Sequence, residues 1–253
     1  MTAFDLTGRT ALVTGASRGI GRAMAVAFAR HGADVALNGR DTALLAEVQA
    51  EIEGLGRKAV VVAADVTDPE AVRSMVDGAI SSLGHLDIVV NNAGGNSFSV
   101  PFLNARPQGW DKVMKLNLDS VVEVCRAVGP HLLERRSGSV INVASVAGLS
   151  AVPTMGHYGT AKAAVLALTR TLAAEWAWAG VRVNSLVPGW VATDLTEFAR
   201  ADDTIGKALI SRVPMQRWAT VDEISGPAVF LASDASSFVT GHSLVVDGGL
   251  TAT

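Results

Sequence analysis

The sequence predicts an α/β fold in which helices cover both faces of one parallel sheet of about seven strands. Short apolar, β-branched runs alternate with longer segments of helical period, and turn residues mark the joins. Several runs, such as 60–62 and 88–90, are apolar at consecutive positions, which is typical of strands buried on both faces. No internal repeat and no linker rich in Pro, Gly or Ser divides the 253 residues, so we expect a single domain.

The expected elements follow a strand-helix rhythm along the chain. The predicted strands are Thr10–Thr14, Asp34–Leu37, Lys58–Ala63, Leu86–Asn91, Ser139–Val143, Arg182–Leu186 and Ser243–Val246. The predicted helices are Gly21–Arg30, Thr42–Leu55, Pro69–Leu83, Gly109–Leu133, Tyr158–Trp178 and Val221–Leu231. Asp68 before Pro69 gives the clearest helix start, because Asp caps a first turn and Pro fits its first position. The alternation indicates a doubly wound sheet with right-handed crossovers.

The charge balance argues against a nucleic-acid or membrane partner. The chain has 21 Lys plus Arg against 24 Asp plus Glu, a formal net charge of −3, and no block of like charges. Binding to nucleic acid or to an anionic membrane needs a concentrated basic footprint. The first residues lack a secretory signal pattern, and no apolar run approaches the ~20 residues that span a bilayer. We therefore expect a soluble, cytoplasmic protein.

The chain has one cysteine, Cys125, and five scattered histidines. A lone cysteine cannot form a disulfide within the chain, and these histidines without a second cysteine do not form a zinc pattern. We expect Cys125 to be a small buried residue, and we expect no metal site.

Two segments are too long to be simple connections. Segments 95–107 and 189–217 each follow the carboxyl end of a predicted strand, the edge of an open α/β sheet where ligands bind. We assign them to the substrate pocket and its lid. Phe98, Trp190, Phe198 and the neighbouring His157 either line that pocket or pack within the lid.

A glycine-rich turn joins the first strand to the first helix. It reads Thr14-Gly15-Ala16-Ser17-Arg18-Gly19-Ile20-Gly21. Glycines permit a tight turn and close approach to a pyrophosphate, and a helix N-terminus offers free N–H groups. The turn is either purely structural or a dinucleotide site, and its strand-turn-helix context favours the site, with contacts from Gly15, Ser17, Arg18, Gly19, Ile20 and Gly21.

The end of the second strand favours NADP(H) over NAD(H). An NAD site generally has an acidic residue here for the ribose hydroxyls, whereas this chain has Asn38-Gly39-Arg40. Arg40 offers several donors to a 2′-phosphate, and Arg18 can reach the same anion. The alternative is that both arginines are solvated and NAD binds, and Asp41 beside Arg40 keeps that alternative open.

A tyrosine and a lysine stand four residues apart on a predicted helix. Tyr158 and Lys162 therefore point from one face, and a nearby ammonium is expected to lower the pKa of the phenol towards the working pH. Ser145 follows the strand 139–143, so its hydroxyl is expected at the carboxyl edge of the sheet. Taken singly, such residues are usually surface pairs, turns or caps; together they indicate acid–base chemistry.

These motifs together resemble the short-chain dehydrogenase/reductase family. The resemblance rests on Thr14-Gly15 to Gly21, Asn91-Asn92-Ala93-Gly94, Ser145 with Tyr158-Gly159-Thr160-Ala161-Lys162, Pro188-Gly189 and Asp247-Gly248-Gly249, and it covers nearly the whole chain. It implies a Rossmann fold and hydride transfer between a nicotinamide and a carbonyl or secondary alcohol. It also implies dimers or tetramers, with a homotetramer expected, built through 109–133, 158–178 and the C-terminal segment.

The resemblance implies a role for each matching residue. Tyr158 would exchange the proton, Ser145 would stabilise the substrate oxygen, Lys162 would also hold the nicotinamide ribose, and Asn117 would support a proton relay. Further cofactor contacts would come from Asp65 and Val66 at the adenine, from Asn92, Ala93 and Gly94 at the adenosine ribose and diphosphate, and from Pro188, Gly189, Val191 and Thr193 at the nicotinamide. Asn38 would belong to the same set, Asn91 would mainly brace the sheet, and Asp65 and Thr193 have helix capping as their alternative.

Several functions remain open within this reading. The segment 37–41 resembles that of sugar-acid (gluconate-type) dehydrogenases, and 3-oxoacyl-(acyl-carrier-protein) reductases are the other near resemblance. Carrier-docking members have arginine where this chain has Ala174, although Arg126, Arg135 and Arg136 are further basic candidates. A regulator that senses NADP(H) without turnover would need no proton donor. A sugar-nucleotide epimerase would have a different glycine spacing and a longer C-terminal part.

Overall fold

A computed structural model describes residues 3–252 and contains one seven-stranded parallel sheet. The strands are β1 (Thr10–Val13), β2 (Asp34–Leu37), β3 (Ala59–Val61), β4 (Ile88–Asn91), β5 (Gly138–Val143), β6 (Val181–Pro188) and β7 (Ser243–Val246). Their order in the sheet is β3-β2-β1-β4-β5-β6-β7, and each neighbouring pair is parallel. The predicted doubly wound sheet is confirmed, and the strand order reverses between β1 and β4, where ligands bind in such sheets.

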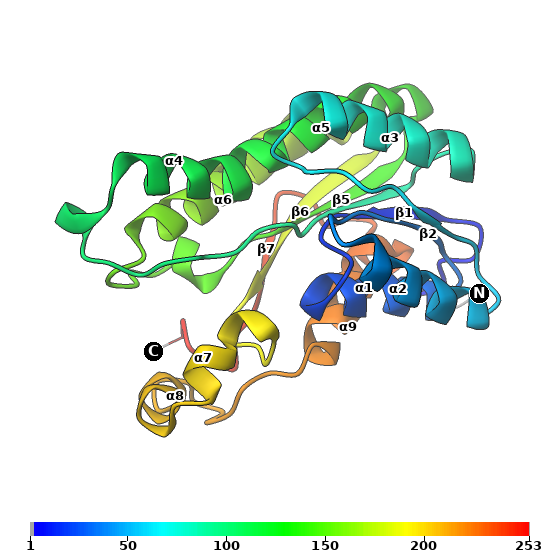
Figure 1. The fold of residues 1–253 in the computed structure, drawn as a ribbon. Coiled ribbons are helices and arrows are strands. Elements are labelled where there is room, and N and C mark those ends of the chain that lie inside the picture. Colours follow the sequence, from blue (N-terminus) through cyan, green and yellow to red (C-terminus); the bar gives the residue numbers. More distant parts are fainter. Residues whose placement is uncertain (1–2, 253) are drawn as a thin grey trace.

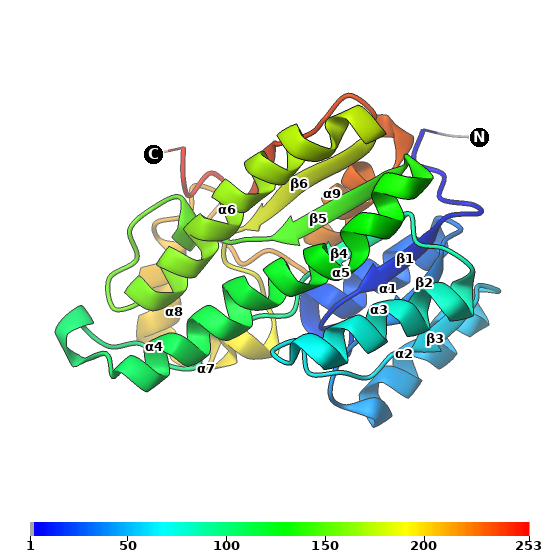
Figure 2. The same cartoon turned by 90° about the horizontal axis from the view of Figure 1, so that it is seen from above.

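Helices cover the sheet on both faces (Figure 1). The helices of the described residues are α1 (Gly19–Arg30), α2 (Thr42–Gly54), α3 (Pro69–Leu83), α4 (Pro107–Met114), α5 (Ser120–Arg135), α6 (Gly156–Trp176), α7 (Glu197–Arg200), α8 (Asp203–Ile210) and α9 (Asp222–Ala232). In Figure 1, α1, α2 and α9 lie on one face and α3, α5 and α6 on the other, and Figure 2 shows the second group from above.

The consecutive apolar residues of the strands serve two separate cores. In β1, Ala11 and Val13 belong to the core under α1, α2 and α9, whereas Leu12 belongs to the core under α3, α5 and α6. Every residue of β1 and β4 is buried. This double coverage is the physical reason for runs that do not alternate between apolar and polar residues.

A chain of buried polar side chains joins the strands in the second half of the sheet. Nδ2 of Asn91 donates to Oδ1 of Asn142 at 2.8 Å, and Nδ2 of Asn142 donates to Oγ1 of Thr169 at 2.9 Å. Ser185 also donates to Oγ1 of Thr169, at 2.8 Å. Asn91 therefore braces β4 against β5, as the sequence predicts.

Two predicted segments differ from the structure. The helix expected over 109–133 is α4 and α5 joined by a π-helical segment, Lys115–Asp119, in which Asn117 inserts a buried side chain. Segment 189–217, for which no helix was predicted, contains the short helices α7 and α8, and the N-cap of α8 is Asp202, whose carboxylate accepts from the N–H groups of Thr204 and Ile205.

Cys125 is buried and unpaired, as expected, and burial raises the pKa of its thiol to about 12. Among the helices within residues 3–252, none is long and apolar enough to cross a membrane.

Candidate active site

A cleft of about 710 Å³ opens at the carboxyl ends of the strands. Its walls come from the glycine-rich turn, the segments that follow β2, β3, β4, β5 and β6, and the first turns of α6. Of the residues predicted from the sequence to bind cofactor or to act in catalysis, all except Asn117 line this cleft. Lys112, Lys115, Asp194 and Leu195 also line it and were missed, because nothing in their local sequence separates them from ordinary surface residues.

The glycine-rich turn is held against β4 by side chains of two neighbouring strands. Nδ2 of Asn92 donates to the carbonyl oxygen of Thr14 at 2.9 Å and to that of Gly15 at 3.2 Å. Gly15 has a φ of +66°, and a Cβ added there would lie 2.9 Å from Nδ2 of Asn92. α1 begins within this turn, at Gly19, and no side chain caps it at Arg18. The turn therefore presents bare backbone and free N–H groups to the cleft, as an anion site requires.

The rim of the cleft beyond β2 carries Arg40. The Asn38 amide is buried and donates to the carbonyl oxygens of Val62 at 3.0 Å and Ala64 at 3.2 Å, so its side chain ties β2 to the segment after β3. Arg40 is exposed, and it has no ion-pair partner among the described residues. Asp41 turns its carboxylate to the N–H of Leu44, as the N-cap of α2.

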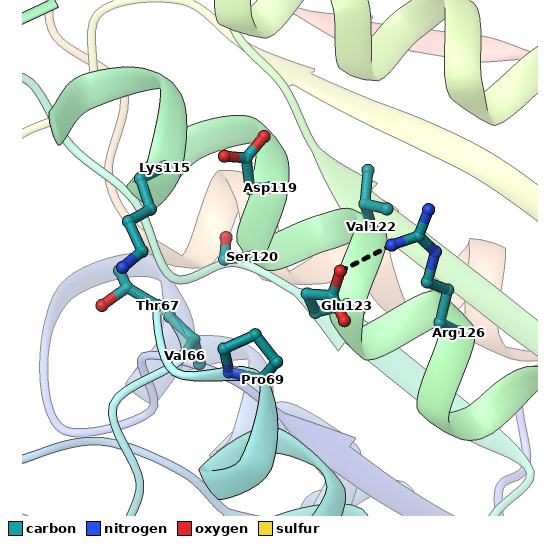
Figure 3. A pocket seen from close by; sticks show the side chains of 9 residues that line it. All are labelled: Val66, Thr67, Pro69, Lys115, Asp119, Ser120, Val122, Glu123 and Arg126. Atoms are coloured by element: carbon teal, nitrogen blue, oxygen red, sulfur yellow. Dashed lines mark hydrogen bonds and ion pairs between the residues drawn. The ribbon is translucent and has the colours of Figure 1, made fainter. Parts of the chain in front are cut away.

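Asp65 and Val66 line the adenine end that the sequence predicts. Oδ1 of Asp65 accepts from the backbone N–H and the hydroxyl of Thr67, at 2.9 Å and 2.8 Å. These bonds hold the pKa of the carboxyl below its ordinary value. The N-cap of α3 is Asp68 and not Asp65. A smaller cavity of about 330 Å³ adjoins this end and shares Val66, Thr67 and Lys115 with the cleft (Figure 3).

Ser145 and Tyr158 meet at the inner end of the cleft. Ser145 starts a short 3₁₀ turn after β5, and its Oγ accepts from the N–H of Ala147 at 3.2 Å. Tyr158 lies in the first turn of α6 and is half-buried. Burial raises the pKa of the Tyr158 phenol, and a hydrogen bond with Ser145 opposes that rise.

Lys162 lies one helical turn after Tyr158 and is buried. Its Nζ donates to the carbonyl oxygen of Val143 at 2.9 Å and lies 5.7 Å from the centre of the Tyr158 ring. Burial lowers the pKa of Lys162 to about 8. The expectation that the ammonium lowers the pKa of Tyr158 is therefore wrong for the protein alone, because burial penalises both charged groups.

Asn117 is fully buried behind the cleft. Its Nδ2 donates to the carbonyl oxygens of Gly95 at 2.9 Å and Val113 at 3.0 Å, and its Oδ1 accepts from the N–H of Gly95 at 2.9 Å. A Cβ added at Gly94 would lie 2.8 Å from Oδ1 of Asn117 and 3.3 Å from Nζ of Lys162. Asn117 therefore fixes the start of segment 95–107 close to Lys162.

The four apolar or aromatic candidates of the long segments do not line the cleft. His157 is buried and stacks on Phe98, with ring centres 4.1 Å apart, and its Nε2 lies 2.8 Å from Oδ1 of Asn96. Trp190 packs edge-on against Trp218 at 5.8 Å, and Phe198 is exposed. Phe98, His157 and Trp190 therefore pack against neighbouring rings, which is the second of the two roles predicted for them.

The segment after β6 forms the remaining wall, which the sequence predicts for the nicotinamide. Pro188 ends β6, Gly189 follows, and Val191 is buried. Thr193 is the N-cap of a 3₁₀ turn, which agrees with the capping alternative given above for this residue. Its Cγ2 faces Gly19 across the cleft and would lie 3.6 Å from a Cβ added at Gly19. Asp194 lies 3.8 Å from the Arg18 guanidinium. The cleft thus has the glycine-rich turn at one end, and the half-buried Tyr158 and the buried Lys162 at the other.

Comparisons with known proteins agree with this geometry. Residues 15–251 match the family described as enoyl-(acyl carrier protein) reductase. The gluconate 5-dehydrogenase of Gluconobacter oxydans is 42% identical over 248 residues, which cover 98% of this chain and 96% of that protein. A 3-oxoacyl-(acyl-carrier-protein) reductase of Thermotoga maritima is 35% identical and covers 97% of this chain and 98% of its own.

The solved structures lead to the same family. The crystal structure of a gluconate 5-dehydrogenase from Burkholderia cenocepacia, in complex with NADP and tartrate, superposes with a TM-score of 0.95 at 39% identity and covers 99% of this chain and 98% of that one. The chain belongs to the short-chain dehydrogenase/reductase family, whose members are oxidoreductases that transfer a hydride between a nicotinamide and a carbonyl or secondary alcohol.

Proposed function

We propose that the protein is an NADP(H)-dependent dehydrogenase of sugar acids, with Tyr158 as its proton donor and acceptor. The observation that carries the proposal is the single cleft in which the glycine-rich turn, Arg40, Ser145, Tyr158 and Lys162 come together. The alternative of a sensor without turnover is disfavoured, because a sensor has no use for a phenol and an amine in a shared pocket.

The residues of the cleft fit a dinucleotide. The first turn of α1 has no side-chain cap, so its N–H groups are available as donors to a diphosphate, and a Cβ at Gly15 would strike Asn92, so the turn packs closely against the segment after β4. Gly15, Ser17, Gly19, Ile20 and Gly21 would hold it. The remaining contacts would come from the adenine, ribose and nicotinamide sets named above, and the nicotinamide supplies the hydride.

Arg40 supports NADP(H) over NAD(H). Its guanidinium is exposed at the rim and has no carboxylate partner among the described residues, and the neighbouring Asp41 carboxylate is engaged in capping α2. Arg18 would be a second partner for that phosphate once it leaves Asp194. Relatives of this chain have been crystallised with NADP.

The protonation states of Tyr158 and Lys162 at neutral pH fit carbonyl reduction. At neutral pH the phenol keeps its proton and can donate it to the substrate oxygen, which the Ser145 hydroxyl would also hold. Lys162, with a pKa of about 8, is charged at neutral pH and would stabilise the phenolate left behind. Both hydrogen-bonding ends of the Asn117 amide are engaged, so a relay through Asn117 would use its backbone carbonyl.

Sugar acids are favoured as substrates by the relatives, several of which are gluconate-type dehydrogenases. 3-Oxoacyl carrier-protein reduction is the second candidate, since relatives of that activity match over equal lengths. Docking of an acyl carrier protein is disfavoured, because this chain has Ala174 where carrier-docking members have an arginine. Segments 95–107 and 189–217 would enclose the substrate, and we call segment 189–217 the lid. A cytoplasmic homotetramer, or dimer, completes the proposal.

The test is a set of assays that follow NADPH and NADH oxidation with 5-keto-D-gluconate and with a 3-oxoacyl thioester. We expect turnover of the keto acid with NADPH, and a kcat about 10²- to 10⁴-fold lower in Tyr158→Phe with an unchanged circular dichroism spectrum. Undiminished turnover in Tyr158→Phe would refute the role of the phenol. Tight NADPH binding without turnover of any carbonyl compound would support the sensor instead.

A further inference from the structure

The Asp247-Gly248-Gly249 turn lies outside the cleft but contacts both ends of the lid. At the first end, the N–H of Gly189 donates to the carbonyl oxygen of Val246 at 3.0 Å. A Cβ added at Gly189 would lie 2.8 Å from Cα of Asp247. The lid therefore leaves β6 in direct contact with this turn.

The other end of the lid returns to the same turn. The N–H of Met215 donates to the carbonyl oxygen of Gly248 at 3.1 Å. A Cβ added at Gly248 would lie 2.9 Å from Cγ1 of Val213, and one added at Gly249 would lie 3.0 Å from Cγ of Pro214. Glycines are thus required here by contact as well as by their φ of +65° and +90°.

Hydrogen bonds from the Asp247 side chain hold the conformation of the turn. Both oxygens of the Asp247 carboxylate are used, because Oδ1 accepts from the N–H of Gly249 at 2.9 Å and Oδ2 accepts from the N–H and hydroxyl of Thr251 at 2.8 Å and 2.7 Å. A carboxylate that collects three donors fixes the loop that supplies them.

Residues 190–192 of the lid are also tied to residues 218 and 219, which directly follow the lid. Val191 and Ala219 form a parallel bridge, the N–H of Ala192 donates to the carbonyl of Ala219 at 2.9 Å, and Trp190 packs on Trp218. Between these ties the lid carries Thr193 and Leu195, which line the cleft.

We infer that the Asp247–Gly249 turn is the seat of the lid, by which we mean the fixed surface on which both ends of the lid pack. Gly248 and Gly249 are then positioning residues, which act on the affinity for substrate through their contacts with Val213, Pro214 and Met215. The inference about substrate rests on the proposed function of segment 189–217. The contact between turn and lid does not rest on it.

The test compares Gly248→Ala with Gly84→Ala. Gly84 is exposed at the end of α3, has a φ of +87°, and has no atom within 4 Å of an added Cβ, so its variant carries the backbone strain without the collision. Arg200, Lys207 and Arg212 are exposed tryptic sites within the lid, so limited trypsinolysis of the free protein reports how firmly the lid is seated. We expect lid cleavage at least about fivefold faster in Gly248→Ala than in Gly84→Ala.

A rescue variant keeps the test decisive if Gly248→Ala folds poorly. Val213→Ala removes the atom that the new Cβ would strike, so the double variant Gly248→Ala/Val213→Ala should be cleaved more slowly than Gly248→Ala. Equal cleavage in Gly248→Ala and Gly84→Ala would overturn the inference.

The kinetic arm separates the inference from the proposed function. With 5-keto-D-gluconate and NADPH, Gly248→Ala should raise the KM for the keto acid about fivefold or more. Faster cleavage with an unchanged KM would leave the seat in place and refute the assignment of the lid to substrate binding.

Discussion

The Thr14 hydroxyl is the structural joint between the glycine-rich turn and β4, and its removal is the sharpest test of how this cleft is built. The side chain is 2% exposed. Its Oγ1 donates to the carbonyl oxygen of Val90 at 3.1 Å and accepts from the N–H groups of Asn92 at 2.9 Å and Ala93 at 3.0 Å. Thr14→Val keeps the shape and deletes all three bonds.

The expected cost follows from the groups left behind. One lost hydrogen bond is worth about 1 kcal/mol, and two partly buried N–H groups without an acceptor add about 1 kcal/mol each, so the free energy of unfolding should fall by about 2–4 kcal/mol. For a chain of this length the melting temperature should fall by roughly 5–15 °C. Affinity for NADPH should fall as well, because Asn92 and Ala93 line the cleft.

The assay is urea unfolding with an NADPH fluorescence titration, and Thr14→Ser is the matched control because it keeps the hydroxyl and loses only a methyl group. If Thr14→Val is within about 0.5 kcal/mol of Thr14→Ser, the hydroxyl does not join the turn to β4 as argued.

Three further predictions concern groups outside this joint. Arg40→Asp should change the ratio of kcat/KM for NADPH over NADH by roughly 10- to 100-fold towards NADH, since a charge-assisted bond is worth about 1.5–3 kcal/mol; an unmoved ratio would refute the 2′-phosphate assignment. Burial, and then Arg135, lower the pKa of His131, whose Nε2 accepts from the N–H of Leu86 at 3.0 Å, so below the ordinary pKa of 6.5 the unfolded chain binds more protons and stability falls on acidification. Urea unfolding at pH 7 and pH 5.5 should show a smaller loss in His131→Gln than in the unchanged protein. Cys125, buried with a thiol pKa of about 12, should react with a thiol reagent only after denaturation, and rapid labelling of the native protein would contradict that burial.

Local signals in the sequence predict most of the fold correctly. Asp68 and Pro69 mark the start of α3 at the predicted residue, and β2 and β7 have the predicted bounds. The break between α4 and α5 has no such signal, because it depends on bonds from Asn117 to Gly95, 22 positions earlier in the chain. The start of α8 does have a signal in the sequence, because Asp202 is a typical N-cap residue, but hydrophobic periodicity alone did not identify a helix in this long connection.

The sequence predicts which residues line the cleft, but it does not predict the burial and packing of each side chain there. Motif spacing brings Ser145, Tyr158 and Lys162 to one edge of the sheet, and the structure places all three along the same cleft. Spacing carries no information about which aromatic side chains face inward, and Phe98 and His157 stack on each other instead of lining the cleft.

The same distinction explains the pKa of Tyr158. Four residues of helix set the separation of the phenol from the amine, and in water that separation would favour the phenolate. In the folded protein, burial lowers the pKa of Lys162 to about 8 and raises the pKa of Tyr158. Burial destabilises the charged form of each group, and this effect exceeds the attraction between the Lys162 ammonium and a Tyr158 phenolate, although Nζ lies only 5.7 Å from the ring centre. The pair therefore holds its phenolic proton at neutral pH. The protein alone thus holds the proton that carbonyl reduction would consume.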